Sequence, residues 1–132
     1  MFNFLQKKNL SLGQLGEKVA VEFLKKRGYL IVCTNFTNKK GRRIGEIDII
    51  AKDKDEFVFV EVKTRKETPY QLSSNPEENI NHQKLHKLQK IATFYIKNNN
   101  LWDSPYRFDG ISLIYNEKTR TFKIKHLKNI FL

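Results

Sequence analysis

The sequence predicts an α/β domain in which helices flank a mixed β-sheet, with the element order α-β-β-β-α-β-β. Two segments carry apolar residues at helical spacing, and five shorter segments are rich in β-branched and aromatic residues. Turn-forming residues separate these segments. Because amphipathic helices bury their apolar sides, we expect both helices to pack on the apolar faces of the sheet.

Length and composition limit the number of domains and the kinds of partner that we expect. A chain of 132 residues is long enough for one core, so we expect residues 1–10 to be an N-terminal extension and residues 11–132 to form a single domain. The formal charge of +11 indicates a polyanionic partner. No apolar run approaches the roughly 20 residues that span a bilayer. The charge therefore fits nucleic acid or an anionic membrane surface, with any membrane contact limited to the surface. We expect nucleic acid, and DNA in particular, and not a membrane, as the partner. The single Cys33 and a start unlike a secretory signal predict a cytoplasmic protein.

The first helix is predicted between a capping box that begins at Ser11 and a C-terminal Gly28. Its apolar side comprises Leu12, Leu15, Val19, Phe23 and Leu24, and the opposite side carries Lys18, Val21 and Lys25. Glu17 falls at the border of the buried side, where an acid is usually a half-exposed surface residue.

The segment 29–36 is predicted to be a strand, buried because it is almost continuously apolar. A basic loop at 37–44 follows it. The loop carries Lys39, Lys40, Arg42 and Arg43. Such a run is either simply solvated charge or, beside a phosphodiester-cleaving site, a grip on the nucleic-acid backbone.

A β-hairpin is predicted over 45–65, with strands at 45–52 and 56–65 around a polar turn. In the second strand Phe57, Phe59, Glu61 and Lys63 share one face, and Val58, Val60 and Val62 share the other. Both faces begin apolar, so we expect both to be covered.

Counting outward from the turn pairs the strands of this hairpin. The predicted pairs are Asp53 with Glu56, Ile50 with Phe59, Asp48 with Glu61, and Glu46 with Lys63. Opposed carboxylates are unfavourable unless a cation or a proton lies between them. The pattern therefore predicts either a site for Mg²⁺ (or Mn²⁺) or a charged hairpin end held by cross-strand salt bridges.

A second helix is predicted from Glu77 or Asn79 to Lys97, after a polar connection at 66–76. Its buried stripe is Leu85, Leu88, Ala92 and Tyr95, with Lys84, Lys87 and Lys90 displayed away from it. A final hairpin is predicted from strands at 106–115 and 121–127. Arg107 and Asp109 are expected to pair with each other or with Lys63, without a catalytic role.

Two motifs carry a resemblance to known proteins. Asp48 followed by Glu61-Val62-Lys63 resembles the PD-(D/E)XK nuclease core, and GEIDIIA followed by FVFVEVKTR resembles the YraN family of small bacterial proteins of uncharacterised function. That family is similar to archaeal Holliday-junction resolvases. The resemblance extends from Leu12 to Asp109 and implies a restriction-endonuclease-like fold. It also implies that Glu17, within Gly16-Glu17-x-x-Ala20, leans into the metal site.

The resemblance implies a function and a set of site residues. The implied catalytic residues are Asp48, Glu61, Lys63 and Glu17, and the implied Mg²⁺ ligands are Asp48, Glu61, Glu17 and the carbonyl of Val62. The implied activity is metal-dependent endonucleolytic hydrolysis of DNA phosphodiester bonds, in branched or repair intermediates. A non-catalytic nucleic-acid-binding module of the same fold is the alternative, and an adaptor in repair or replication is a third. We expect nucleic acid to contact Lys39, Lys40, Arg42, Arg43, Lys84 and Lys87. A homodimer is compatible with the resemblance, since resolvases cut two strands as pairs.

Overall fold

The computed structural model describes residues 10–68 and 82–130. Its elements are α1 (Leu12–Lys26), β1 (Leu30–Thr37), β2 (Glu46–Asp53), β3 (Glu56–Lys66), α2 (His82–Asn98), β4 (Tyr106–Asn116) and β5 (Thr121–Leu127). This order confirms the predicted α/β fold class. The predicted start of the second helix at Glu77 or Asn79 lies outside the described residues. Within the described ranges, no helix is long and apolar enough to cross a membrane.

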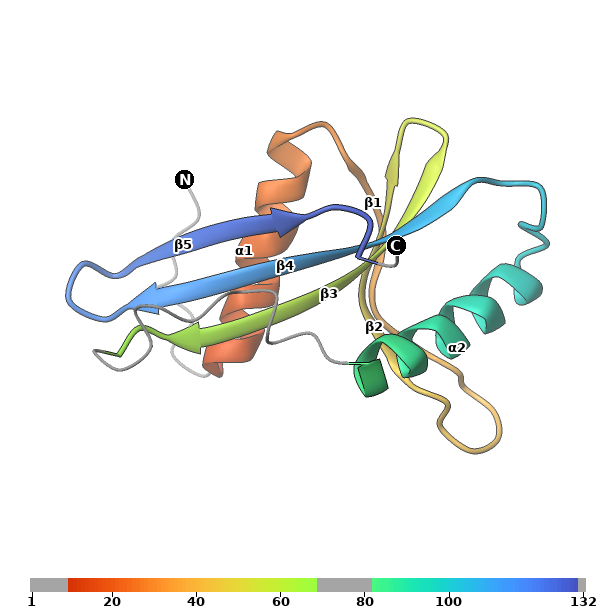
Figure 1. Cartoon of the computed structure of the whole chain (residues 1–132), viewed down its shortest axis with the longest axis horizontal. Coiled ribbons are helices and arrows are strands. Elements are labelled where there is room, and N and C mark those ends of the chain that lie inside the picture. The colour runs from red at the N-terminus through yellow and green to blue at the C-terminus, as the bar shows by residue number, and fades with distance from the viewer. Residues whose placement is uncertain (1–9, 69–81, 131–132) are drawn as a thin grey trace.

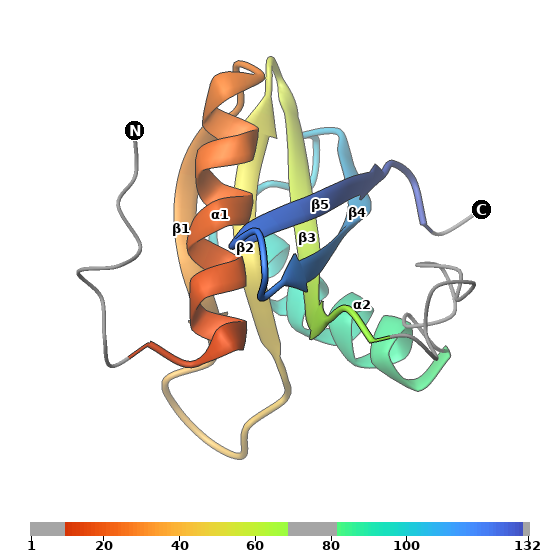
Figure 2. The same ribbon diagram turned by 90° about the vertical axis from the view of Figure 1, so that its left-hand side faces the viewer.

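The five strands form one sheet in the order β1-β2-β3-β4-β5. The sheet is mixed, because β3 and β4 are parallel while the other neighbours are antiparallel. Helix α1 covers one face and α2 covers the other (Figures 1 and 2). On the central strand, Val58 and Val60 pack on the α1 side and Phe59 packs on the α2 side. The prediction that both faces of this strand are covered is confirmed.

Helix α1 begins as the sequence predicts. Ser11 and Gln14 form a reciprocal capping box, and Gly28 follows the C-cap with a φ of 89°. The fully buried stripe, however, consists of Gly16, Ala20 and Leu24. Val21, predicted on the far side, is half-buried against the core. Leu24 is buried as predicted, and Val19 and Phe23 also pack against the core. The helix is nevertheless rotated from its predicted position, because the small residues Gly16 and Ala20 face the sheet as well.

The reason for this rotation is a close approach between Gly16 of α1 and Thr64 of β3. A Cβ atom built on Gly16 would lie 1.9 Å from the Thr64 Oγ1 and 2.8 Å from its Cβ. Only glycine allows the helix to lie so close to this strand. The approach matters for the site because Glu17 is the next residue in the helix.

Strand β1 differs from its prediction. It is an edge strand, paired with β2 alone in the described sheet, and most of its side chains are exposed or half-buried. Leu30 and Val32 are 64% and 40% exposed. The prediction of a buried strand was wrong because a continuous apolar run does not reveal whether a strand has one neighbour or two.

Arg107 and Asp109 hold the turn end of the β2–β3 hairpin. The buried Arg107 guanidinium donates to Asp109, to Asp53 at 3.1 Å and to Glu56 at 2.6 Å. Asp109 is fully buried; its burial alone would raise its pKa, but hydrogen bonds from His126, Arg107 and the Asn129 N–H lower the pKa below its usual value. The predicted mutual pairing of these two residues is confirmed, at the opposite end of the hairpin from Asp48 and Glu61.

The close approach of α1 to β3 gives the first testable prediction. Gly16→Ala should lower the free energy of unfolding by about 1 to 3 kcal/mol, because the new methyl overlaps Thr64 and forces the helix outward. The measurement is urea unfolding followed by circular dichroism. Gly13→Ala in the same helix is the matched control, since its Cβ would come no closer than 3.9 Å to Ser11 Oγ. The control should be neutral or stabilising by up to about 1 kcal/mol. Equal stability of the two variants would contradict the close approach.

Candidate functional site

The β2–β3 hairpin opens at the end where the acids lie. The predicted pairs Asp53 with Glu56 and Ile50 with Phe59 are present, but the pairing ends at Ile49 with Val60. The predicted cross-strand pairs Asp48 with Glu61 and Glu46 with Lys63 therefore do not form. Instead, the backbone N–H of Val62 donates to Asp48 Oδ2 at 2.8 Å. Where the two strands separate, the Asp48 carboxylate therefore accepts the Val62 N–H in place of a backbone carbonyl of β2.

A break in side-chain alternation on β2 orients this carboxylate. Ile49 and Ala51 pack on the α1 side, but Ile47 packs on the α2 side together with Ile50, whereas strict alternation would place it with Ile49. On the neighbouring β1, Asn35 lies between the paired residues Thr34 and Phe36 and has a φ of 52°. The backbone is therefore irregular in both strands next to Asp48. Counting residues from the hairpin turn cannot predict such an irregularity.

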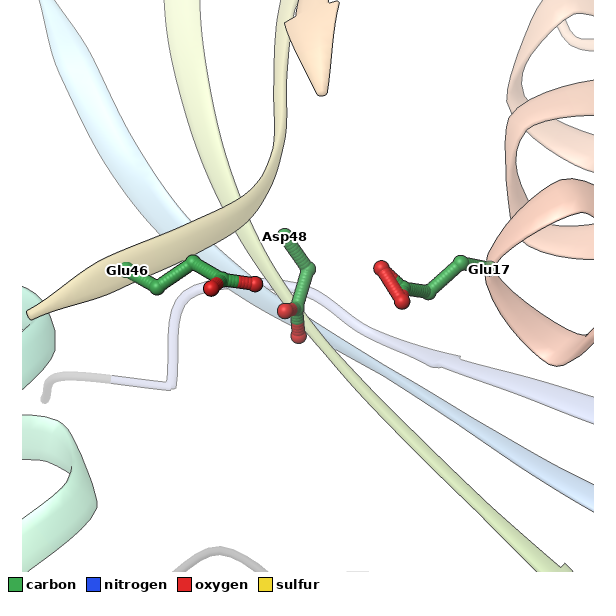
Figure 3. Close-up of side chains that lie close together, drawn as sticks. All are labelled: Glu17, Glu46 and Asp48. Carbon is green, nitrogen blue, oxygen red and sulfur yellow. The ribbon is translucent and has the colours of Figure 1, made fainter. Parts of the chain in front are cut away.

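Three carboxylates meet at this point. Glu17, Glu46 and Asp48 each offer an oxygen atom, and these oxygens lie within 4.8 Å of one another. Figure 3 shows Glu46 and Asp48 on β2 and Glu17 reaching toward them from α1. Sequence reasoning missed Glu46 as a member of this group. The signal was its spacing of two residues from Asp48, which is the spacing that places strand side chains on a common face.

Neighbouring donors hold two of these acids in place. The Asn35 amide donates to Glu17 Oε1 at 2.7 Å and to Glu46 Oε1 at 3.2 Å. Arg43, from the basic loop, forms an ion pair with Glu46. These contacts offset part of the repulsion between the carboxylates, and they link α1, β1, β2 and the loop at one point.

Glu61 lies at the border of this group, beside two lysines. Lys84 Nζ of α2 lies 3.9 Å from Glu61 Oε1. Burial raises the pKa of Glu61, while the charges of Lys84 and Lys63 oppose that rise. Lys84 was predicted to be displayed away from the buried stripe of the helix, and its side chain is 41% exposed; its contact with Glu61 was not predicted. Helical spacing alone did not show that the helix begins beside the open end of the hairpin.

Asp48 has the most perturbed acidity of the group. Burial, followed by the negative charge of Glu61, raises the pKa of Asp48 from 3.8 to about 7. The hydrogen bond from the Val62 N–H opposes the rise, and the charges of Glu17 and Glu46 add to it. A carboxylate in such an environment gains stability from a proton or from a cation.

The donor set fits a divalent metal ion. Mg²⁺ takes oxygen ligands in an octahedron at roughly 2.1 Å, which places neighbouring oxygens roughly 3 to 4 Å apart. Carboxylate oxygens within 4.8 Å of one another meet this requirement after small side-chain adjustments. Glu17, Glu46 and Asp48 can therefore hold a metal ion together. Ligation by Glu61 and by the Val62 carbonyl stays a prediction.

The basic loop is folded around Asn38. The buried Asn38 side chain donates to the carbonyls of Lys40 and Arg42 and accepts from the Ile44 N–H. This leaves the side chains of Lys39, Lys40 and Arg42 exposed, while Arg43 pairs with Glu46. Of the α2 lysines predicted to contact nucleic acid, Lys87 is exposed and Lys84 faces Glu61.

Comparisons with known proteins agree with the resemblance seen in the motifs. Residues 16–113 match the model of the uncharacterised protein family UPF0102. A UPF0102 protein of Clostridium botulinum is 42% identical over 93% of this chain and 95% of its own length. A UPF0102 protein of Dictyoglomus turgidum is 37% identical over 93% of this chain and 98% of its own length.

The raised pKa of Asp48 predicts how stability depends on pH. The folded-state pKa of about 7 lies above the ordinary 3.8, so the folded protein holds more protons in this interval and its unfolding free energy falls as pH rises. Asp48→Asn removes this titration and can still accept the Val62 N–H. In EDTA at about pH 7 the variant should be more stable than wild type, by on the order of 1 to 3 kcal/mol. Urea unfolding at several pH values should show the difference shrinking toward about pH 4.

Metal should narrow this difference in stability. Mg²⁺ at ten times its Kd stabilises a folded state that binds it by about 1.4 kcal/mol, a rise of roughly 3 to 6 °C in Tm for wild type. Asp48→Asn should respond little, and the exposed Asp103→Asn should behave as wild type. If wild type ignored Mg²⁺ and Asp48→Asn were the less stable protein in EDTA, Asp48 would be a structural ion-pair partner.

Proposed function

This chain belongs to the UPF0102 family, the YraN family of uncharacterised proteins, and from that premise we propose that it is a metal-dependent endonuclease-like protein acting on DNA. The observation that carries the proposal is the group formed by Glu17, Glu46 and Asp48 at the open end of a hairpin. The proposed chemistry is hydrolysis of phosphodiester bonds, in branched or repair intermediates. The proposed cofactor is Mg²⁺ or Mn²⁺, since hard carboxylate oxygens suit both ions.

The proposed roles of the acids follow from their positions. Asp48 and Glu46 on β2 and Glu17 on α1 would hold the ion from two sides, with Glu61 and the Val62 carbonyl completing the set from β3. The chemistry supplied by a divalent ion at this place is Lewis acidity, which makes water a better nucleophile and stabilises charge on the phosphate. The Val62 N–H holds Asp48 Oδ2 in place, and because the carboxylate is planar and rigid, this also fixes the position of Oδ1.

The proposed roles of the lysines follow from their proximity to Glu61. Lys63 lies close enough for its charge to act on the pKa of Glu61. From this position Lys63 orients or deprotonates the attacking water, or neutralises the phosphate during the reaction. Lys84 reaches the same carboxylate from α2, so we assign it a positioning role beside the phosphate rather than general contact with the duplex.

A second candidate is a non-catalytic nucleic-acid-binding module of the same fold. The observation that favours it is the set of internal partners on the acids, because Arg43 pairs with Glu46 and Asn35 donates to Glu46 and Glu17. Internal partners on Glu46 and Glu17 reduce the contribution that a bound metal ion would make to stability. The basic loop serves binding in both candidates, since Lys and Arg contacts to phosphate position a duplex without reading its sequence.

Cleavage assays separate the two candidates. With Mg²⁺ or Mn²⁺, wild type should cut branched, nicked or single-stranded DNA, and Asp48→Asn, Glu61→Gln and Lys63→Ala should each lower the rate about 100-fold or more. Glu46→Gln should lower it as well, because Glu46 belongs to the carboxylate group. Asp103→Asn, an exposed acid in the turn after α2, is the matched control. Wild type that binds a broad panel of DNA and RNA structures and cuts none of them supports the binding module.

Salt dependence tests the basic loop. Each phosphate contact contributes roughly −0.9 to the slope of log K against log salt on duplex DNA. Replacing Lys39, Lys40, Arg42 and Arg43 together by Ala should therefore flatten the slope. The control removes the same charge from the opposite edge of the sheet by replacing Lys118, Lys123, Lys125 and Lys128, all exposed. Equal flattening by the two variants would mean that net charge, and not the loop, determines binding.

A further inference from the structure

A groove runs between the edge strand β1 and the C-terminal end of α2. Its volume is about 690 Å³, within the range of about 300 to 1,000 Å³ that ligand pockets occupy. The residues that matter for its chemistry are Asn35, Phe36, Lys39, Lys40, Phe94 and Asn98. We refer to it as the β1–α2 groove.

The charge of the β1–α2 groove is positive. Two lysines and no carboxylate line it, and neither Lys39 nor Lys40 belongs to an ion pair within 10–68 and 82–130. A second groove, of about 540 Å³, lies against α1, and there Glu17 and Glu22 balance Lys18 and Lys25. An anionic chain that approaches β1 is therefore favoured on the α2 side.

The apolar part of the groove is aromatic. Phe36 packs edge-on against Tyr95 with ring centroids 5.0 Å apart, and Phe94 lies beside it at 6.4 Å. Phe36 and Phe94 are both half-buried, so part of each ring stays available. Aromatic rings next to lysines form a surface on which unpaired bases stack while their phosphates are neutralised. Asn98 adds an exposed side-chain amide that can bond a base edge.

The groove opens beside the acidic centre, which is the group formed by Glu17, Glu46 and Asp48. Asn35 lines it, and the amide of the same residue donates to Glu17 and Glu46. The loop that carries Lys39 and Lys40 is fixed at its base, because Thr37 Oγ1 donates to the Gly45 carbonyl at 2.7 Å. The groove and the carboxylate group therefore meet at Asn35.

We propose that the β1–α2 groove binds unpaired nucleotides of a DNA substrate, so that the acidic centre receives the junction between a duplex and a single-stranded tail, flap or gap. This inference rests on the proposed function, since it names the substrate class for that site. Duplex DNA is a poorer occupant, because its bases are stacked on each other and cannot reach Phe36 and Phe94.

Binding in EDTA tests the groove without any cleavage. Fluorescence anisotropy compares a labelled duplex with the same duplex carrying a 5′ or a 3′ single-stranded tail. Wild type should bind one or both tailed forms about five- to tenfold more tightly than the blunt form. Equal affinity for all three forms overturns the proposal.

Two variants connect a tail preference to the groove. Phe94→Leu keeps an apolar side chain but loses the flat ring, and Lys40→Ala removes an exposed charge without touching the core; each should reduce the preference for tails at least about threefold. Phe23→Leu, a half-buried Phe on α1, and Lys125→Ala, on the opposite edge strand, are the matched controls and should retain it. A preference that survives both groove variants overturns the proposal.

Cys33, the single cysteine, lines the groove and reports on its occupancy. Tailed DNA should slow alkylation of Cys33 by N-ethylmaleimide, and blunt duplex should not. Protection by blunt duplex alone overturns the proposal.

The groove proposal and the nuclease proposal can fail separately. If wild type prefers tails, Phe94→Leu loses that preference and no substrate is cut, the groove is upheld and the nuclease function is not. Cleavage that depends on Asp48, without tail preference, does the reverse.

Discussion

Repulsion between carboxylates in a partly buried place is the constraint on which the rest of the structure depends. Glu17, Glu46 and Asp48 bring their oxygens within 4.8 Å of one another, and Glu61 adds its charge to raise the pKa of Asp48. The fold holds them there because two apolar cores enclose β3 from both faces. Each buried side chain of such a core contributes about 1.5 to 3 kcal/mol. The acids can therefore be kept together against their repulsion, at the one place where β2 and β3 have separated.

Two features far apart in the chain determine where β2 and β3 separate. At the turn end, Arg107 bonds Asp53, Glu56 and Asp109, so the hairpin is fixed where it closes. At the other end, Gly16 lets α1 lie against Thr64 of β3, which brings the following glutamate to the open strands. If β2 and β3 stayed paired along their whole length, Asp48 and Glu61 would be ordinary cross-strand neighbours. Because the turn end is fixed and the other end is open, Glu17, Glu46 and Asp48 gather at the open end.

The fold was predictable from the sequence because its signals are local. The Ser11 capping box, the turn at Lys54-Asp55 and the alternation in β3 each depend on neighbours in the chain. Glu46, the exposure of β1 and the contact between Lys84 and Glu61 depend instead on which elements are adjacent in space. Hairpin counting is correct from Asp53 as far as Ile49, and it fails at Asp48 because β2 changes faces there: Ile47 packs on the α2 side. Periodicity carries no information about such a local break.

An ion pair connects the acidic centre to the basic loop beside it. The chain carries a formal charge of +11, yet four of its acids, Glu17, Glu46, Asp48 and Glu61, lie together at the open end of the hairpin. Arg43 of the basic loop pairs with Glu46 there. A cation that binds Glu46 competes with Arg43 for the same carboxylate. The guanidinium displaced in this way stays on a loop that Asn38 holds in place, and under the proposed function it would lie next to the phosphate that the cation attracts. Under the proposed function, positive charge therefore stabilises the acids before a substrate binds, and the same charge is available to the nucleic-acid backbone afterwards.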